Sequence, residues 1–213
     1  MAAAPSQQAA GRWHEERSSR AYIGLGSNLG DPAAQLRAAL THLAGRWTIV
    51  ARSSVYATAP VGGPSGQREY LNAVVAVSAP GVDPHQLLLR LLNIEHDMGR
   101  TRGERWGPRL IDLDLLALGD VVVGGRHIAA DAHGADHGPQ AGELVLPHPR
   151  LAERAFVLVP LCEIAALRNE SAPPWLHPVT GLDACAMLAA LAGSQAESDV
   201  AAALGVRRTD LRW

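Results

Sequence analysis

The sequence predicts an α+β fold in which helices pack against an antiparallel sheet. The first observation is the order of the expected elements, which runs strand–helix–strand–strand–helix–strand between residues 21 and 118. The second is local patterning, because the expected strands alternate or are rich in β-branched residues and the expected helices carry regularly spaced leucines. The third is size, since 213 residues with 47% apolar content suffice for one domain with a buried core.

The first expected strand, residues 21–25, is short and apolar and leads into the glycine-rich run 24–32. Glycines permit a tight turn there. Asp31 can cap a helix whose first residue is Pro32, and Gly45 ends the leucine periodicity that follows. This turn could bind an anion at the helix N-terminus. A plain strand-to-helix turn explains the pattern equally well.

A second strand is expected over residues 47–58 and a third over 70–78, with a loop of turn-forming residues at 59–67. Tyr70 and Asn72 stand two residues apart, so they share one face of the third strand. An aromatic ring and an amide suit a flat, hydrogen-bonding heterocycle. Ordinary cross-strand residues show the same pattern, which leaves both interpretations open.

Asp83 and Pro84 predict the start of a second helix, which should end at Gly99. Its apolar stripe consists of Leu87, Leu91, Ile94 and Met98. Glu95 lies one position off this stripe, where an exposed glutamate would be unremarkable.

The most informative stretch is the strand 111–118, in which apolar residues alternate with Asp112 and Asp114. On a strand the two carboxylates emerge from one face, roughly 6.5–7 Å apart along the chain. They repel each other and raise each other's pKa. A divalent cation removes that conflict, and Mg²⁺ typically takes one or two carboxylates together with substrate phosphates. Two solvated residues at a sheet edge are the alternative interpretation.

Four arginines precede this strand within ten residues: Arg100, Arg102, Arg105 and Arg109. Guanidinium groups match phosphate oxygens in bidentate geometry. The acidic pair and the arginine cluster together predict a metal-bound polyphosphate.

Gly119 and Asp120 predict a hairpin turn into a strand at 121–123. The glycine-rich, polar residues 124–142 are then expected to form a flexible insertion. Three histidines in it, His127, His133 and His137, raise the alternative of a metal site, but their spacing fits no compact ligand pattern. Beyond the insertion, helices are expected after Phe156 and over residues 182–191.

Composition limits the remaining possibilities. Residues 1–20 mix small, polar and charged residues without periodicity and are expected to be a disordered tail. Cys162 and Cys185 lie in apolar contexts and are expected to be buried free thiols of a reducing compartment. No stretch predicts a membrane span or a signal peptide, so a cytoplasmic location without a membrane partner is expected. The net charge of −2 gives no general case for a nucleic-acid partner.

Four blocks of the chain resemble the 6-hydroxymethyl-7,8-dihydropterin pyrophosphokinase family. They are Gly-Ser-Asn-Leu-Gly at 26–30, Tyr-x-Thr-x-Pro-x-Gly and Gln-x-x-Tyr-Leu-Asn within 56–72, Arg-Trp-Gly-Pro-Arg-x-Ile-Asp-Leu-Asp at 105–114, and Leu-Pro-His-Pro-Arg with Arg-Ala-Phe within 146–156. The blocks follow the family's order. Residues 21–192 would then form the catalytic domain and residues 193–213 a C-terminal extension.

Two positions depart from the family pattern. Leu110 stands where a threonine is more usual, and Val145 stands where a threonine often lies. Both concern the nucleotide side of the site.

The resemblance implies a ferredoxin-like fold and transfer of pyrophosphate from ATP to the dihydropterin, with release of AMP, in folate biosynthesis. The implied catalytic residues are Arg100, Arg109, Asp112 and Asp114, of which the two aspartates would hold two Mg²⁺ ions together with ATP. The implied pterin-binding residues are Thr58, Val61, Tyr70, Asn72, Trp106 and Phe156. The implied ATP-binding residues are Glu95, Arg100, Arg102, Arg105, Trp106, Arg109, Leu115, His148 and Arg154. Other enzymes of the folate pathway are candidate partners.

Three of these assignments specify geometry. Phe156, the single phenylalanine, would stack on the pterin face opposite Tyr70, and Trp106 would close over the site as part of a mobile loop. His148 and Arg154 would contact phosphates. A core aromatic and a helix-capping histidine are the structural alternatives for Phe156 and His148.

Two other functional classes compete with this interpretation. Nucleotidyltransferases also use Gly-Ser followed by Asp-x-Asp, but their two motifs usually lie close together, whereas Ser27 and Asp112 are far apart. A ferredoxin-like binding module would explain the fold, although it gives no reason for Arg-Trp-Gly-Pro-Arg.

Overall fold

The computed structural model describes residues 19–100, 107–124, 144–167, 174–193, 201 and 204–213. Its centre is one sheet in the order β5-β1-β4-β3-β6, with β2 pairing β4 beside this path. Every pairing between strands is antiparallel. The strands are β1 (Arg20–Ser27), β2 (Thr48–Arg52), β3 (Tyr56–Thr58), β4 (Tyr70–Ser78), β5 (Asp112–Leu118) and β6 (Val206–Arg208).

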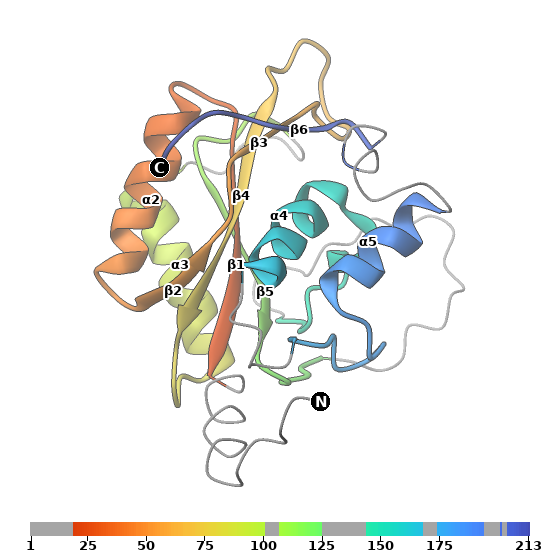
Figure 1. Cartoon of the computed structure of the whole chain (residues 1–213). Helices are drawn as coiled ribbons and strands as arrows, with labels where there is room; N and C mark the ends of the chain where they lie inside the picture. The colour runs from red at the N-terminus through yellow and green to blue at the C-terminus, as the bar shows by residue number, and fades with distance from the viewer. Residues whose placement is uncertain (1–18, 101–106, 125–143, 168–173, 194–200, 202–203) are drawn as a thin grey trace, which may run out of the picture.

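Helices cover both faces of this sheet. The described helices are α2 (Pro32–Ala44), α3 (Pro84–Asp97), α4 (Ala155–Ala166), α5 (Ala184–Ala192) and the 3₁₀ turn η1 (Leu151–Glu153). Helices α2 and α3 lie on one face, and α4 and α5 lie on the other (Figure 1). The order of β1 to β5 and the position of α2 and α3 agree with the predicted ferredoxin-like α+β fold.

The alternation of the strands divides the core into two clusters. Ile23, Val75 and Leu113 point toward α2 and α3 and are at most 3% exposed. Tyr22 and Val74, one residue away on β1 and β4, instead pack with α4 and α5. Because a strand turns successive side chains to opposite faces, each strand supplies both cores.

The predicted helix starts are confirmed. Asp31 Oδ1 accepts a hydrogen bond from the Ala34 N–H at 3.0 Å, and Pro32 is the first residue of α2. Asp83 caps α3 in the same way, with Pro84 as the first helical residue.

Several local expectations were wrong. β1 continues through Gly24 and Gly26 to Ser27, so these glycines belong to a strand and not to the turn. The expected strand 47–58 is split into β2 and β3. The expected hairpin after β5 does not form: Val123 makes an isolated antiparallel bridge with Leu146 and does not pair with β5.

The C-terminal segment also adds to the sheet. β6 pairs with β3, and Trp213 Nε1 donates to the carbonyl oxygen of Ser53 at 2.9 Å. Of the predicted tail, residues 1–20, only the last two are described, and Arg20 already begins β1. The expected insertion lies outside the described residues except for Gly124.

Cys162 and Cys185 form a disulfide between α4 and α5, so the expectation of free thiols was wrong. Two helices packed side by side bring the cysteines together although 23 positions separate them in the sequence.

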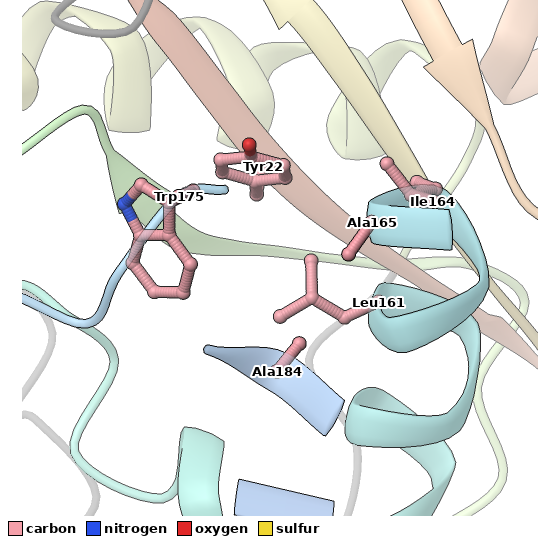
Figure 2. Close-up of a pocket in the computed structure, with 6 residues that line it drawn as sticks. All are labelled: Tyr22, Leu161, Ile164, Ala165, Trp175 and Ala184. Carbon is pink, nitrogen blue, oxygen red and sulfur yellow. The ribbon is translucent and has the colours of Figure 1, made fainter. Parts of the chain in front are cut away.

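A small apolar cavity lies between β1, α4 and α5 (Figure 2). Trp175 closes one side of it, and its Nε1 donates to the carbonyl oxygen of Gly119 at 2.7 Å. The rings of Trp175 and Tyr22 lie 5.4 Å apart between centroids. The cavity contains none of the predicted site residues and belongs to the packing of the second core. Within the described ranges, no helix combines the length and the apolar character that crossing a membrane requires.

Candidate functional site

The acidic pair lies at the start of β5, on the face that carries α4 and α5. Asp112 stands opposite Gly26 of β1, and Asp114 stands opposite Gly24. Between them, Leu113 is buried in the core beneath α2 and α3. The two carboxylates therefore share one face, as the alternation predicts.

Asp112 is surrounded by guanidinium groups. Its Oδ1 lies 2.5 Å from Arg109 Nη1 and 2.8 Å from Arg100 Nη1. Burial lowers the pKa of the Arg109 guanidinium, but the negative charge of Asp112 and the hydrogen bond to it outweigh this effect. The pKa of Arg109 is therefore raised. Both arginines come from the loop before β5, so a single short segment concentrates positive charge at the acidic pair.

Glu95 is 3% exposed, which rules out the alternative interpretation of an ordinary surface glutamate. Its carboxylate accepts hydrogen bonds from Arg100 and, at 2.6 Å, from the Leu113 N–H. Burial raises the pKa of Glu95 to about 7, although these two donors partly oppose that effect. Glu95 therefore joins the end of α3 to the arginine and the strand of the site.

Asp114 lies beside the segment that begins α4. Its Oδ2 is 3.5 Å from Arg154 Nη1, and the Arg154 guanidinium lies 5.6 Å from the centre of the Phe156 ring. Partial burial and then the negative charge of Asp112 raise the pKa of Asp114 well above its usual range. Arg154 thus contacts both Asp114 on β5 and the ring of Phe156, which the sequence predicts to stack on the pterin.

His148 lies in the same segment. Its backbone N–H donates to the carbonyl oxygen of Leu116 at 2.8 Å, and its ring Nδ1 accepts from the Arg150 backbone N–H at 3.1 Å. Burial, together with the positive charges of Arg154 and Arg150, lowers the pKa of His148 to about 4. At neutral pH this imidazole is therefore uncharged and can donate only from Nε2.

The predicted pterin residues are next to the acidic pair. Asn72 Nδ2 donates to Thr58 Oγ1 at 2.8 Å, and both residues are 6% exposed. The hydroxyl of Tyr70 donates to the carbonyl oxygen of Gly107 at 3.1 Å, and burial raises its pKa. This contact joins β4 to the loop that carries Arg109.

Gly26 separates the two halves of the site and was missed as a functional residue. A Cβ on Gly26 would lie 3.2 Å from Asn72 Oδ1 and 3.9 Å from the Asp112 Cβ. The backbone at Gly26 therefore lies close to Asn72 and Asp112, and a side chain there would crowd Asn72. The available signal was a glycine inside a strand pattern, which often marks a close approach of a ligand.

Asn28 is a second residue that the sequence did not identify. It is 1% exposed, its Oδ1 accepts from the Arg109 N–H at 2.8 Å, and its Nδ2 donates to Gln67 Oε1 at 3.2 Å. Ser27 Oγ donates to the carbonyl oxygen of Leu110 at 2.6 Å. The Gly-Ser-Asn turn therefore orders the arginine loop by hydrogen bonds.

The other predicted residues lie less centrally or cannot be placed. Arg102, Arg105 and Trp106 fall outside the described residues. Val61 is 71% exposed on the loop after β3. The Leu115 side chain is buried beneath α2 and α3, so only its backbone could contact a nucleotide.

The donor set fits a hard cation that also receives ligands from a substrate. Among the residues the structure describes, no group of three or more His, Cys, Asp or Glu side chains could form a closed metal site. Asp112 and Asp114 instead offer two carboxylates on one face, beside arginines that suit phosphate. One or two carboxylates completed by phosphate oxygens and water is the usual environment of Mg²⁺ in enzymes.

Comparisons with known proteins give one result. A protein from Methylorubrum extorquens named 2-amino-4-hydroxy-6-hydroxymethyldihydropteridine pyrophosphokinase is 46% identical over 149 residues, covering 69% of this chain and 83% of the relative. A Bacillus subtilis protein of the same name is 40% identical over 146 residues, covering 68% of this chain and 77% of the relative.

A solved structure of Plasmodium falciparum HPPK-DHPS with pterin and p-hydroxybenzoate matches with a TM-score of 0.60 at 15% identity. The match covers 89% of this chain but 44% of that longer one, so it supports the fold alone. The family model described as 7,8-dihydro-6-hydroxymethylpterin-pyrophosphokinase (HPPK) matches residues 22–166. With these matches and this geometry, the chain belongs to the 7,8-dihydro-6-hydroxymethylpterin-pyrophosphokinase family.

Proposed function

We propose that this chain transfers pyrophosphate from ATP to 6-hydroxymethyl-7,8-dihydropterin, releasing AMP, as a step of folate biosynthesis. Family membership supports this proposal. The single structural observation that carries it is the pair Asp112 and Asp114 on one sheet face, contacted by Arg100, Arg109 and Arg154. This arrangement suits a metal-bound triphosphate.

Asp112 and Asp114 would hold two Mg²⁺ ions. When bound, the ions would neutralise phosphate charge and lower the pKa of the attacking hydroxyl. Burial, and then the negative charge of Asp112, raise the pKa of Asp114, and a bound cation would favour its ionised form. Three arginines already face these carboxylates and would offset the charge that develops on the transferred group.

ATP would lie along the loop before β5 and the segment before α4. Arg100, Arg109 and Arg154 would contact its phosphates, with Arg102 and Arg105 as further candidates. The neutral His148 would contribute a hydrogen bond rather than a charge. Glu95 would act by holding Arg100 in place, and Leu115 would contribute its backbone.

The dihydropterin would bind on the other side of Gly26. Tyr70 and Phe156 would stack on its two faces, and Asn72 with Thr58 would recognise its polar edge. The backbone near Val61 would contribute further contacts, and Trp106 would cover the site and help exclude water. The missing side chain at Gly26 would let the hydroxymethyl oxygen approach the phosphates in line.

The location is proposed to be cytoplasmic, where ATP is abundant. Other enzymes of the folate pathway are proposed as partners. The Plasmodium falciparum HPPK-DHPS structures support this suggestion, because HPPK and DHPS are named there as one protein.

The deciding experiment incubates the purified chain with ATP, MgCl₂ and 6-hydroxymethyl-7,8-dihydropterin and identifies the adenine product. AMP that forms only when metal and pterin are both present is the expected result. ADP would instead indicate a simple kinase, and released pyrophosphate would indicate a nucleotidyltransferase. Binding of the pterin without turnover would indicate a binding module.

A further inference from the structure

Glu163 is a half-buried carboxylate on α4, outside the acidic and arginine cluster. Its Oε2 accepts from the Ser54 N–H at 2.7 Å and from the Tyr56 hydroxyl at 3.0 Å, and its Oε1 accepts from Ser54 Oγ at 2.7 Å. The side chain is 19% exposed. One carboxylate on a helix therefore receives three hydrogen bonds from a segment more than 100 residues earlier.

In all three contacts the carboxylate oxygens are the acceptors. Burial and the negative charge of Glu163 raise the pKa of Tyr56 to about 12, so its phenol remains a donor at neutral pH. Arg208 of β6 places Nη2 at 3.4 Å from Glu163 Oε1 and supplies an opposite charge. Because Arg208 is 68% exposed, the hydrogen bonds from Ser54 and Tyr56 dominate this contact.

The segment held by Glu163 carries Thr58, which together with Asn72 is proposed to recognise the polar edge of the pterin. β3 is three residues long and ends at Thr58, which hydrogen-bonds Asn72. Its other edge pairs with β6, where Thr58 stands opposite Val206. A strand this short depends on neighbouring elements for its position.

Helix α4 carries Phe156, one of the two residues proposed to stack on the pterin. Phe156 is its second residue, and Glu163 lies two turns further along the same helix. α4 packs on β3, β4 and β6 through apolar side chains, which fix distance but resist sliding less well than directed hydrogen bonds. Glu163 therefore links the helix of Phe156 to the strand of Thr58 by contacts of defined geometry.

We propose that Glu163 is a positioning residue that sets the separation between the stacking residue Phe156 and the edge-recognising residue Thr58 of the pterin site. This inference rests on the proposed function. Of the groups that would bind the triphosphate, Asp112, Asp114, Arg100 and Arg109 lie on other segments, and Arg154 adjoins the start of α4. Loss of Glu163 should therefore affect the pterin more than ATP. A general structural role would instead weaken the binding of both substrates and lower the thermal stability together.

The test compares steady-state kinetics of the wild type with Glu163→Ala, Glu163→Gln and Tyr56→Phe. The expected result for Glu163→Ala is a KM for the dihydropterin raised on the order of tenfold, since small displacements of positioning groups have large effects. The KM for ATP and kcat should change less than about twofold. Glu163→Gln keeps an acceptor oxygen and the volume and should restore most of the affinity.

Tyr56→Phe removes one donor and should raise the same KM by a smaller factor. In the double variant with Glu163→Gln the two effects should be less than multiplicative, because both act on one contact. Asp97→Ala is the control, since this exposed acid pairs with Arg46 at the end of α3. It should leave both KM values unchanged.

The outcomes separate the two proposals. Wild-type protein that forms no AMP would refute the proposed function. Normal wild-type turnover with an unchanged pterin KM in Glu163→Ala, or with equal increases in both KM values, would refute the role of Glu163 alone. If Glu163→Ala does not fold, the two milder variants decide by the same criterion, with melting curves showing that they remain folded.

Discussion

Asn28 and Arg109 hold each other through a pair of hydrogen bonds across 81 positions of the sequence, one of them to the Asn28 side chain. The Arg109 N–H donates to Asn28 Oδ1 at 2.8 Å, and the Asn28 N–H donates to the Arg109 carbonyl oxygen at 3.0 Å. The arginine that contacts Asp112 therefore has a backbone fixed by the glycine-rich turn after β1. These two hydrogen bonds explain how a loop can hold the Arg109 guanidinium group in a defined position.

The first prediction concerns this pair. Asn28→Ala should lower the free energy of unfolding by about 1–3 kcal/mol, because the buried Arg109 N–H loses its acceptor. It should also lower kcat, since the Arg109 guanidinium is no longer aligned. Asn28→Asp keeps an oxygen toward Arg109 and should retain more activity than the alanine variant. Urea unfolding and steady-state AMP production measure both effects, and equal activity of the two variants would contradict this account.

The second prediction uses two glycines of β1 as a matched pair. Gly26→Ala places a methyl group 3.2 Å from Asn72 Oδ1 and should raise the KM for the dihydropterin strongly. Gly24→Ala places one 3.5 Å from the Leu116 side chain, an ordinary contact, and should leave that KM nearly unchanged. Melting temperatures of both variants should show that they fold. A larger effect at Gly24 than at Gly26 would argue against a ligand above Gly26.

The third prediction concerns the acidic pair. Asp114→Asn should lower AMP production by more than about a hundredfold, because even the residues that support metal ligands often contribute 10–100-fold. The melting temperature without metal should not fall, since removing one of two repelling charges relieves strain in the site. Asp120→Asn, on the exposed turn after β5, is the control and should behave as wild type. Wild-type rates in Asp114→Asn would refute the proposed metal site.

The fourth prediction concerns pH and His148. The pKa of His148 falls from 6.5 to about 4 on folding, so between these values the unfolded state binds more protons. This residue therefore contributes stability at neutral pH that is lost as the pH falls from about 6.5 to about 4. Glu95 has the opposite sign, because its raised pKa makes the folded state bind more protons between pH 4.5 and about 7.

Comparison of wild type with His148→Gln isolates the histidine. The melting temperature of the variant should fall less steeply than that of the wild type as the pH is lowered from 6.5 to 4, by a few degrees over this range. Thermal melts at several pH values measure the difference. Parallel curves would show that His148 is not held neutral by its surroundings.

The elements and their order could be predicted because their signals are local. Alternation in β5, the caps Asp31 and Asp83, and leucine spacing in α2 each depend on a few neighbouring residues. The shared face of Asp112 and Asp114 follows from the same two-residue period. These features therefore required no knowledge of tertiary contacts.

The features that were missed depend on distant contacts. Glu95 is buried because Arg100 and the Leu113 N–H compensate its charge, and no local pattern shows that pairing. β6 has three residues and pairs with a strand about 150 positions earlier, so it has no periodicity of its own. The disulfide required the packing of α5 on α4 to be known. Gly26 was assigned to a turn because glycine inside a strand is locally unfavourable.

The pairing of β6 with β3 has a consequence for self-association. A free strand edge offers unpaired N–H and C=O groups to other chains and promotes aggregation. β6 covers the edge of β3 and presents Arg207 and Arg208, both exposed, toward the solvent. Charged side chains on an outer strand discourage a further strand from adding. Displacement of β6 would therefore show first as clustering of molecules in concentrated solution.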